Sequence, residues 1–376
     1  MEIYPAIAES NIEKLRAQLR DVLIVRDAKV LEAPDRVVWF SGQLVQDAES
    51  AYAAVRERFR ALGYTPLLQR QGDSEVIIAQ QGIVVARPSQ AWINIALFFA
   101  TLLSTLVTGA VNEVGQMVPR AEMILPLMLS RPVLLLSGLP FALSLMSILL
   151  AHEMGHYIVG RRYNAPVSLP YFIPMPIAGL FGTLGAVIVQ RAPFEDRKSL
   201  FDIGVAGPLA GLVVALPLLV YGLATSPVGP ITRPALMEGN SILYLAVKFI
   251  IFGKILPGNG IDVMLNPIAW AAWGGLLITS LNLLPIGQLD GGHTLYALLG
   301  KRAWPVAMVI VGLLVVMGIF WQGWLLWAFL VLIFGVRHPA PLNDVSSMGT
   351  RRILLGIGVL ILFILTFTPI PFTAIQ

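Results

Sequence analysis

The feature that most constrains this chain is a series of apolar segments that approach or exceed the length needed to cross a membrane. A helix needs about 20 apolar residues to cross roughly 30 Å of hydrocarbon. Composition agrees, because 56% of the 376 residues are hydrophobic and only 13% are charged, against about 25% charged in a typical soluble domain. We therefore predict a polytopic α-helical membrane protein with about seven spans, at residues 92–111, 133–159, 203–224, 268–284, 304–320, 321–336 and 353–368.

The first 88 residues have a different pattern, typical of a small soluble α+β domain. Ala48–Leu62 has apolar residues at helical spacing, and residues 9–21 indicate a further helix. Three segments have the residue types of strands, at 37–44, 65–68 and 76–79. We predict this domain at residues 1–88, with a possible regulatory role, and a transmembrane domain at residues 89–376 whose functional core is about 133–300.

Basic residues set the predicted orientation in the membrane. With seven spans, pairs such as Arg161–Arg162, Lys301–Arg302 and Arg351–Arg352 fall on one side, and an excess of Lys and Arg marks the cytoplasmic side. The N-terminal domain is then cytoplasmic. The net charge of +4 is explained by such loops, so it gives no reason to expect nucleic acid as a partner.

Two segments do not fit a simple pattern of spans. Residues 163–198 include the apolar run SLPYFIPMPIAGLFGTLGAVIVQ, whose prolines and glycines argue against a helix, while Gly185–Gln190 has strand character. We predict a β-hairpin that dips into the membrane, covered there by protein or a water-filled cavity. Ser241–Leu256 is apolar but contains Lys248 and Lys254, which favours an interfacial or re-entrant position over a crossing.

The end of the second predicted span contains the sequence HEMGH, with His152, Glu153 and His156. On a helix, residues four apart share a face, so two imidazoles can bind one zinc ion while the Glu lies close to the water that the metal activates. Ionisable groups are costly within a membrane helix and imply a function. Arg161 follows His152 by nine residues, about 14 Å of helix, which places this site inside the bilayer near the cytoplasmic side.

A catalytic zinc site usually has three protein ligands, so one ligand is missing. The chain has no cysteine and only four histidines. Asp290, in the sequence LDGGH after the fourth predicted span, is the acidic residue that best fits the same side of the membrane. His293 is the other candidate for the third ligand, and its alternative role is a supporting hydrogen bond. Gly291 and Gly292 are predicted to allow a sharp turn here.

Asn282, three residues before Pro285, is a candidate for hydrogen bonding to a substrate carbonyl or to a developing oxyanion. Its alternative role is a polar contact between helices. His338, beside Arg337 at the end of a span, is expected to have an interfacial role.

The motifs together resemble the site-2 protease family of intramembrane zinc metalloproteases. They are HEMGH at 152–156, FGTLGA at 181–186, AGPLAG at 206–211, and NLLP followed by LDGG at 282–292. The sequences SLPYFIPMP and PFEDRKSLFDIGVAGPLAG also resemble the EGY branch, found in plants, cyanobacteria and other prokaryotes. No PDZ domain fits into residues 225–267. A multi-pass protein of a prokaryotic plasma membrane is the expectation.

The resemblance implies one zinc ion held by His152, His156 and Asp290, with Glu153 as general base and Asn282 contacting the substrate. It also implies that the hairpin, at Gly182, Thr183, Leu184 and Gly185, pairs with an unwound segment of a transmembrane protein substrate. A strand edge can replace the hydrogen bonds that such a segment loses when it leaves its helix.

Three other functions remain open at this point. A divalent-metal transporter would also place His and Asp in its spans, although no internal repeat is visible. A proteolytically inactive binding protein would share the fold. Another class of membrane zinc protease would complete the site with a Glu from a further helix.

Overall fold

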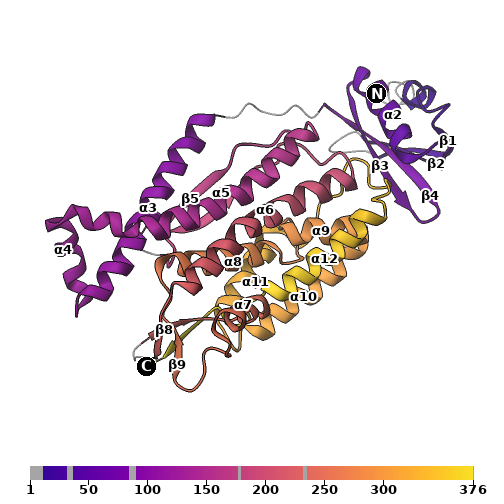
Figure 1. Ribbon diagram of the computed structural model, residues 1–376. Coiled ribbons are helices and arrows are strands. Elements are labelled where there is room, and N and C mark those ends of the chain that lie inside the picture. The colour runs from indigo at the N-terminus through magenta and orange to yellow at the C-terminus, as the bar shows by residue number, and fades with distance from the viewer. Residues whose placement is uncertain (1–11, 32–36, 84–89, 177–178, 232–234, 376) are drawn as a thin grey trace. The chain divides into compact units, whose positions relative to one another are not determined.

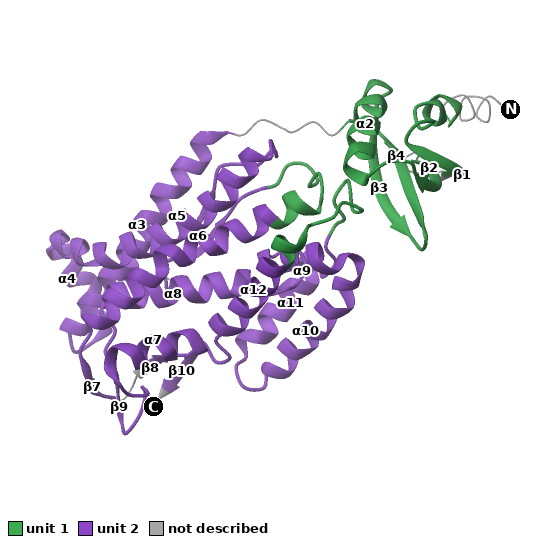
Figure 2. Cartoon of the chain, turned by 45° about the vertical axis from the view of Figure 1, so that its right-hand side comes forward, with its two compact units in different colours: residues 1–87, 190–201, 339–353 green, residues 88–189, 202–338, 354–376 purple. Residues whose placement is uncertain are grey.

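The computed structural model describes residues 12–31, 37–83, 90–176, 179–231 and 235–375, and the chain divides into two compact units (Figure 2). Unit 1 comprises residues 1–87, 190–201 and 339–353, and unit 2 comprises residues 88–189, 202–338 and 354–376. The predicted domain boundary at residues 88–89 lies outside the described residues.

Unit 1 is built on an antiparallel four-stranded sheet with strand order β1-β2-β4-β3. Helix α2 (Ala48–Ala61) buries Tyr52, Val55 and Phe59 in its core. The strands are β1 (Leu23–Leu31), β2 (Val37–Leu44), β3 (Tyr64–Gln71) and β4 (Ser74–Gln81). The α+β prediction is confirmed for this region, but β1 was missed. Of the helix predicted at residues 9–21, residues 12–17 are helical and its start lies outside the described residues.

Helix α2 begins at a side-chain cap. The Asp47 carboxylate accepts hydrogen bonds from the backbone N–H groups of Glu49 (3.1 Å) and Ser50 (3.0 Å), which otherwise lack partners in the first turn. Hydrogen bonds from Ser50 lower the pKa of Asp47 below its usual range, and the bond from the Ser50 backbone N–H has the largest effect. The cap fixes the point where the chain turns from β2 into the helix.

Two later segments of the chain complete unit 1. Leu68 of β3 donates its N–H to the Leu342 carbonyl (2.7 Å) and accepts from the Asp344 N–H (2.8 Å). The 342–344 segment bonds in turn to the segment before α6, with Leu342 N–H to the Phe194 carbonyl (2.9 Å). Ion pairs join Arg56 to Glu195, Lys198 to Glu49 and Arg197 to Asp344. The sheet is thus extended by residues far away in sequence.

The remaining helices are mostly apolar, and α5, α6 and α8 run alongside one another (Figure 1). The long ones are α3 (Ala91–Met117), α5 (Leu139–Arg162), α6 (Arg197–Ala224), α8 (Pro267–Asn282), α10 (Ala303–Met317) and α12 (Thr350–Thr366). The shorter ones are α4 (Ile124–Ser130), α7 (Ile242–Phe252), α9 (Asp290–Leu299) and α11 (Gly323–Phe334), with 3₁₀ turns η1 (Ala121–Met123), η2 (Pro132–Gly138) and η3 (Gly300–Arg302).

Within the described part of the chain, four continuous helical segments are long and apolar enough to cross a membrane: 91–117, 132–162, 197–224 and 290–317. They include four of the seven predicted spans. The other three coincide with α8, α11 and α12, of 16, 12 and 17 residues. Because these are shorter than the ~20 residues of a full crossing, seven spans remains a prediction. Helix α7, in the segment predicted to be interfacial or re-entrant, has 11 residues.

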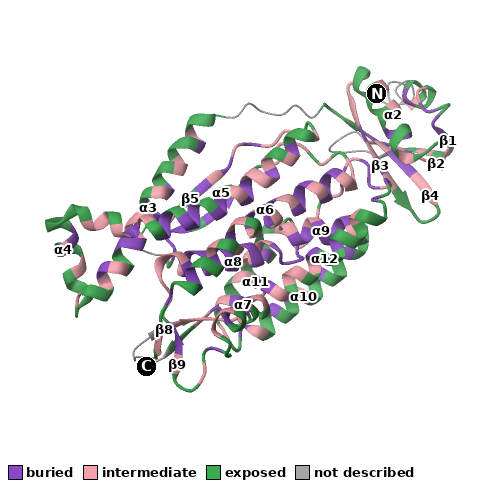
Figure 3. Ribbon diagram, viewed as in Figure 1, coloured by how far each residue is buried: buried purple, intermediate pink, exposed green. Residues whose placement is uncertain are grey.

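The core of unit 2 lies around α8, which is buried along most of its length (Figure 3). Its small residues allow close packing, since a Cβ at Gly275 would lie 2.7 Å from the Ile148 side chain of α5. Helices α10 and α11 instead leave one apolar face exposed, as expected for a lipid-facing surface. Strands form three two-stranded sheets: β5 (Tyr171–Pro174) with β6 (Thr183–Val187), β7 (Val228–Pro230) with β9 (Ile261–Val263), and β8 (Ala235–Glu238) with β10 (Phe372–Ile375).

Candidate metal centre

Helix α5 positions the three residues of the HEMGH motif in the interior of unit 2. The side chains of His152 and His156 lie on one face, one turn apart, with ring centroids 5.0 Å apart. His152, Glu153 and His156 are 3%, 4% and 5% exposed. Groups of this kind are rarely buried without partners, so each needs a specific neighbour.

Asp290, the first residue of α9, is that neighbour for both imidazoles. Its Oδ2 lies 3.2 Å from His152 Nε2, and its Oδ1 lies 3.3 Å from His156 Nε2. One ligand atom from each of the three residues lies within 4.8 Å of the others. The structure thus brings together residues 138 positions apart in sequence.

These donor atoms fit a zinc ion. Zinc–nitrogen and zinc–oxygen bonds of about 2.0–2.2 Å at tetrahedral angles place neighbouring ligand atoms about 3.3–3.5 Å apart. The two nitrogen-to-oxygen separations, 3.2 Å to Oδ2 and 3.3 Å to Oδ1 of Asp290, are each close to this, with each imidazole facing a different oxygen of the carboxylate. Two imidazoles and one carboxylate also leave a fourth position for water or substrate, as in catalytic zinc sites.

The backbone of α6 orients His156. Its Nδ1 lies 2.7 Å from the carbonyl oxygen of Ile203, so Nδ1 carries the proton that is donated to that oxygen. The lone pair on Nε2 is then free to bind a metal beside Asp290. Such outer hydrogen bonds fix the tautomer and ring orientation of metal-binding histidines.

Glycines of α6 make room for the imidazoles. A Cβ at Gly207 would lie 2.0 Å from His156 Nε2, and one at Gly211 would lie 3.2 Å from His152 Nδ1. Both glycines belong to the motif AGPLAG at 206–211, but the sequence did not indicate that imidazoles pack against them. Their spacing of four residues, which repeats that of His152 and His156, was the available signal.

Asn282 ends α8 at the edge of this site. Its Nδ2 lies 3.4 Å from His152 Nε2, so its amide group is within reach of a molecule bound at the metal. The predicted residue therefore lies beside the centre and also contacts another helix, which fits both of its predicted roles.

The turn before Asp290 differs from the prediction. Gly291 and Gly292 are helical residues in the first turn of α9, and the left-handed residue is Gly287, with φ of 55°. Gly291 is needed for close approach, because a Cβ there would lie 1.9 Å from the Leu283 carbonyl oxygen. The chain therefore turns before the LDGG motif, and the glycines let α9 pack against the end of α8.

Strand β6 of the hairpin ends next to Glu153. The backbone N–H of Ile188, the residue after β6, interacts electrostatically with the carboxylate of Glu153. Among the described residues, β6 pairs only with β5, so its other edge has no strand partner. The strand spans Thr183–Val187 rather than the predicted 185–190.

The four predicted hairpin residues lie at the start of β6. Gly182 and Gly185 have φ of 70° and 104°, which glycine adopts without strain. The buried Thr183 hydroxyl donates to the Ile173 carbonyl at 2.9 Å. The Leu184 side chain is 65% exposed, so this strand presents an apolar surface.

The other two histidines form a separate pair. His293 Nδ1 lies 2.6 Å from His338 Nε2, and the His338 ring stacks on Tyr296 with centroids 4.6 Å apart. His293 is therefore not among the three clustered ligands, and its alternative role as a supporting hydrogen bond is the one that the structure favours. The interfacial role expected for His338 remains a prediction, to which the structure adds this pairing with His293.

The class of protein follows from the fold, the site and a comparison with family models. The model of Peptidase family M50 matches residues 140–321, which include α5, the hairpin, α6, α8 and α9. This segment, just under half of the chain, is therefore similar to Peptidase family M50, and zinc is the cofactor that this similarity implies.

In relatives of the EGY branch, the similarity extends beyond that segment. "Probable zinc metalloprotease EGY1, chloroplastic" of Arabidopsis thaliana is 31% identical over 306 residues, covering 75% of this chain and 54% of that protein. "Probable zinc metalloprotease EGY2, chloroplastic" of the same plant is 30% identical over 244 residues, covering 64% and 43%. The chain spans about half the length of these curated relatives, and no solved structure matches it.

Proposed function

We propose that this protein is an intramembrane zinc metalloprotease that hydrolyses a peptide bond within or near the transmembrane segment of a membrane-protein substrate. The observation that carries the proposal is the convergence of His152, His156 and Asp290 in the interior of unit 2, next to a buried Glu153. The family match and the names of the relatives support the same reaction class.

In this proposal His152, His156 and Asp290 hold one zinc ion per chain. The bound zinc supplies a Lewis acid that makes water a nucleophile near neutral pH. Glu153 takes a proton from that water as the water oxygen attacks the scissile carbonyl carbon. Glu153 then gives the proton to the leaving amine nitrogen as the C–N bond breaks. The Ile188 N–H, which interacts electrostatically with the Glu153 carboxylate, helps to hold it in place for both transfers.

Asn282 and the hairpin hold the substrate. The Asn282 amide donates a hydrogen bond to the scissile carbonyl oxygen, where negative charge develops. Residues 182–185 and the rest of β6 pair with the substrate backbone through the unpaired strand edge. An unwound substrate segment recovers there the hydrogen bonds that it lost on leaving its helix.

We further infer a multi-pass protein with seven crossings, cleavage near the cytoplasmic side and a cytoplasmic N-terminal domain, residues 1–88, with a regulatory role. The basic residues beside the spans support this orientation. The relatives reported above are named as chloroplastic, so a prokaryotic plasma membrane remains a prediction. Protease digestion from the outside or the inside of proteoliposomes tests the orientation.

The sharpest test of the function is Glu153→Gln in the full chain, purified into liposomes with a model transmembrane substrate. Because the zinc ligands remain, zinc should stay at about one per chain while cleavage falls by about 10²–10⁴-fold. Glu122→Gln is a matched control, since Glu122 is 76% exposed on its side chain and pairs only with Arg120 among the described residues. Cleavage at the normal rate in Glu153→Gln would contradict the assignment.

The same preparation separates the competing functions. A divalent-metal transporter would move zinc into liposomes, and that flux would persist in Glu153→Gln. A proteolytically inactive binding protein would bind zinc and substrate, yet the wild-type chain would leave every substrate intact.

A further inference from the structure

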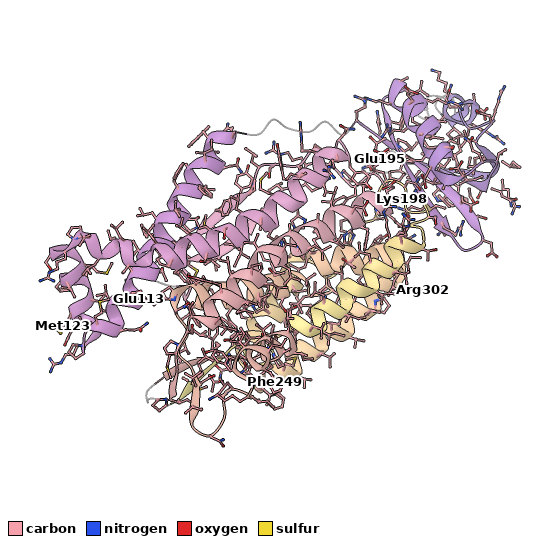
Figure 4. All side chains as sticks on the ribbon, in the orientation of Figure 1. Glu113, Met123, Glu195, Lys198, Phe249 and Arg302 are labelled. Carbon is pink, nitrogen blue, oxygen red and sulfur yellow. The ribbon has the colours of Figure 1, made fainter. Side chains whose placement is uncertain are left out.

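Helix α3 has polar residues on its buried face and large apolar residues on its exposed face. Four of its seven buried residues are polar: Asn94, Thr101, Ser104 and Thr105. Trp92 and Phe99 are exposed, as expected for a lipid-facing surface. The only charged residue of α3, Glu113, lies in its second half (Figure 4). Uncharged polar groups in a helix that crosses a membrane need hydrogen-bond partners within the protein.

Asn94 binds the chain where it enters strand β5. Its Nδ2 donates hydrogen bonds to the carbonyl oxygen of Leu169 at 2.8 Å and to that of Pro170 at 3.0 Å. Pro170 is the residue directly before β5. One amide group of α3 thus fixes the start of the hairpin.

Ser104 binds the other end of the hairpin. Its hydroxyl donates to the Gly182 carbonyl at 2.6 Å, and the same oxygen accepts from the Met175 N–H at 3.0 Å. Met175 directly follows β5, and Gly182 directly precedes β6. Gly182 also packs closely on α3, because a Cβ there would lie 2.5 Å from Thr108 Oγ1. A single carbonyl therefore joins α3 to the ends of both strands.

The two anchors match the length of β5. From Asn94 to Ser104 is ten residues, about 15 Å of helix. From Pro170 to Met175 is five residues, about 17 Å of extended chain. Between the anchors, the Phe98 ring packs edge-on against Phe172, with centroids 5.2 Å apart. Helix α3 thus runs alongside β5 from one end of the strand to the other.

This arrangement leaves β6 as the strand that can pair with a substrate. Pro170 and Pro174 have no N–H to donate to a further strand. Asn94 already occupies the carbonyls of Leu169 and Pro170. Because β6 pairs with β5, an anchor that fixes β5 also fixes the opposite edge of β6.

We propose that Asn94 and Ser104 are positioning residues that hold the hairpin in place, so that the β6 edge is already formed when the substrate backbone pairs with it. The inference rests on the proposed function and deepens it. Helix α3 lies outside the segment that matches the family model, and no step of the proposed mechanism uses it. Its role is to strengthen substrate binding, because a preformed edge does not have to be ordered when the substrate arrives.

The kinetic test uses the full chain in liposomes with a model transmembrane substrate. Ser104→Ala and Asn94→Leu each remove one anchor, and each should raise KM about threefold, the average effect of a hydrogen bond between membrane helices. The double variant should raise KM about tenfold. Because neither residue reaches the metal centre, kcat should stay within about twofold and zinc at about one per chain. A lower kcat with unchanged KM would contradict the proposal.

Ser147→Ala is the matched control. It removes a hydroxyl of α5 that donates to the Ser144 carbonyl of its own helix at 2.8 Å, so it leaves the hairpin anchors intact. Its KM should equal that of the wild type. A KM raised as much in Ser147→Ala as in Ser104→Ala would overturn the positioning role.

Hydrogen exchange tests the anchors without any substrate. Amides of β6 should exchange about threefold faster in Ser104→Ala, and amides at the start of β5 should do so in Asn94→Leu. Amides in the first half of α5 should keep their wild-type rates in both variants, which separates a loosened hairpin from a general loss of stability. Unchanged exchange in the hairpin of both variants overturns the proposal.

Binding distinguishes a failed positioning role from a failed protease. In the Glu153→Gln background, adding Ser104→Ala should weaken binding of the labelled transmembrane substrate about threefold. If the wild type cleaves nothing but this weakening is measured, the positioning role stands and proteolysis fails. If the wild type cleaves its substrate while exchange, KM and binding are the same in Ser104→Ala, proteolysis stands and the positioning role fails.

Discussion

Unit 2 contains two pairs of histidines that use the same side chain in different ways. His152 and His156 come from one helix and face a carboxylate, Asp290, at 3.2 and 3.3 Å. His293 and His338 come from separate segments and face each other at 2.6 Å, with Tyr296 stacked on one ring. In the first pair, Asp290 supplies an anionic third donor to both imidazoles. A shared carboxylate, rather than the nearness of two imidazoles, therefore distinguishes a candidate metal centre from a structural contact.

The largest expected effect comes from removing a histidine of the first pair, with removal of a histidine of the second pair as the comparison. His156→Ala deletes one of three ligands, so zinc should fall from about one per chain to below about one tenth, and cleavage should fall by at least about 10³-fold. His293→Ala should keep zinc near one per chain. Metal analysis after gel filtration in detergent measures both. Zinc loss in His293→Ala with retention in His156→Ala would reverse the comparison.

A smaller effect is expected from filling the space around the first pair. Gly207→Ala places a Cβ 2.0 Å from His156 Nε2, so the imidazole must move and zinc affinity should fall about 10–100-fold. Gly312→Ala in α10 is the matched control, because no atom lies within 4 Å of its Cβ. That change should be neutral or stabilise by about 0.5–1 kcal/mol. Competition with a zinc chelator measures the affinities, and equal affinities in both variants would contradict the packing argument.

The smallest effect is expected in the second pair. His338→Phe removes the hydrogen bond to His293 but keeps a ring that can stack on Tyr296. The protein should lose about 1 kcal/mol of stability, the net value of one hydrogen bond, while zinc content and kcat stay unchanged. Thermal unfolding in detergent, with and without added zinc, tests this. A fall in zinc content would show that the second pair supports the metal centre.

What the sequence could predict depended on how local each feature is. The face shared by His152 and His156 follows from helix geometry, and it was predicted together with Glu153. Asp290 required a topological argument because it lies 138 residues from His152. The pairing of His293 with His338 could not be predicted, because nothing local brings a residue of α9 next to one beyond α11.

The fold shows the same limit. Strand β2 was predicted with its observed bounds, Val37–Leu44, since its residue types are typical of strands. Strand β1 was missed because its sequence, LIVRDAKVL, has charged residues at its centre. It also contains an irregularity between Val25 and Asp27, which interrupts the alternation that a periodicity search needs.

The extended sheet of unit 1 has a consequence for the order in which the protein is made. Leu342 and Asp344, which bond to Leu68, are translated about 270 residues after it. At about 5–20 residues per second, this takes roughly 15–55 s. During that time the edge of β3 has no partner from this later segment, and edges of this kind invite pairing with other chains. The N-terminal sheet can reach its final form only after the last helix but one, α11, has been synthesised.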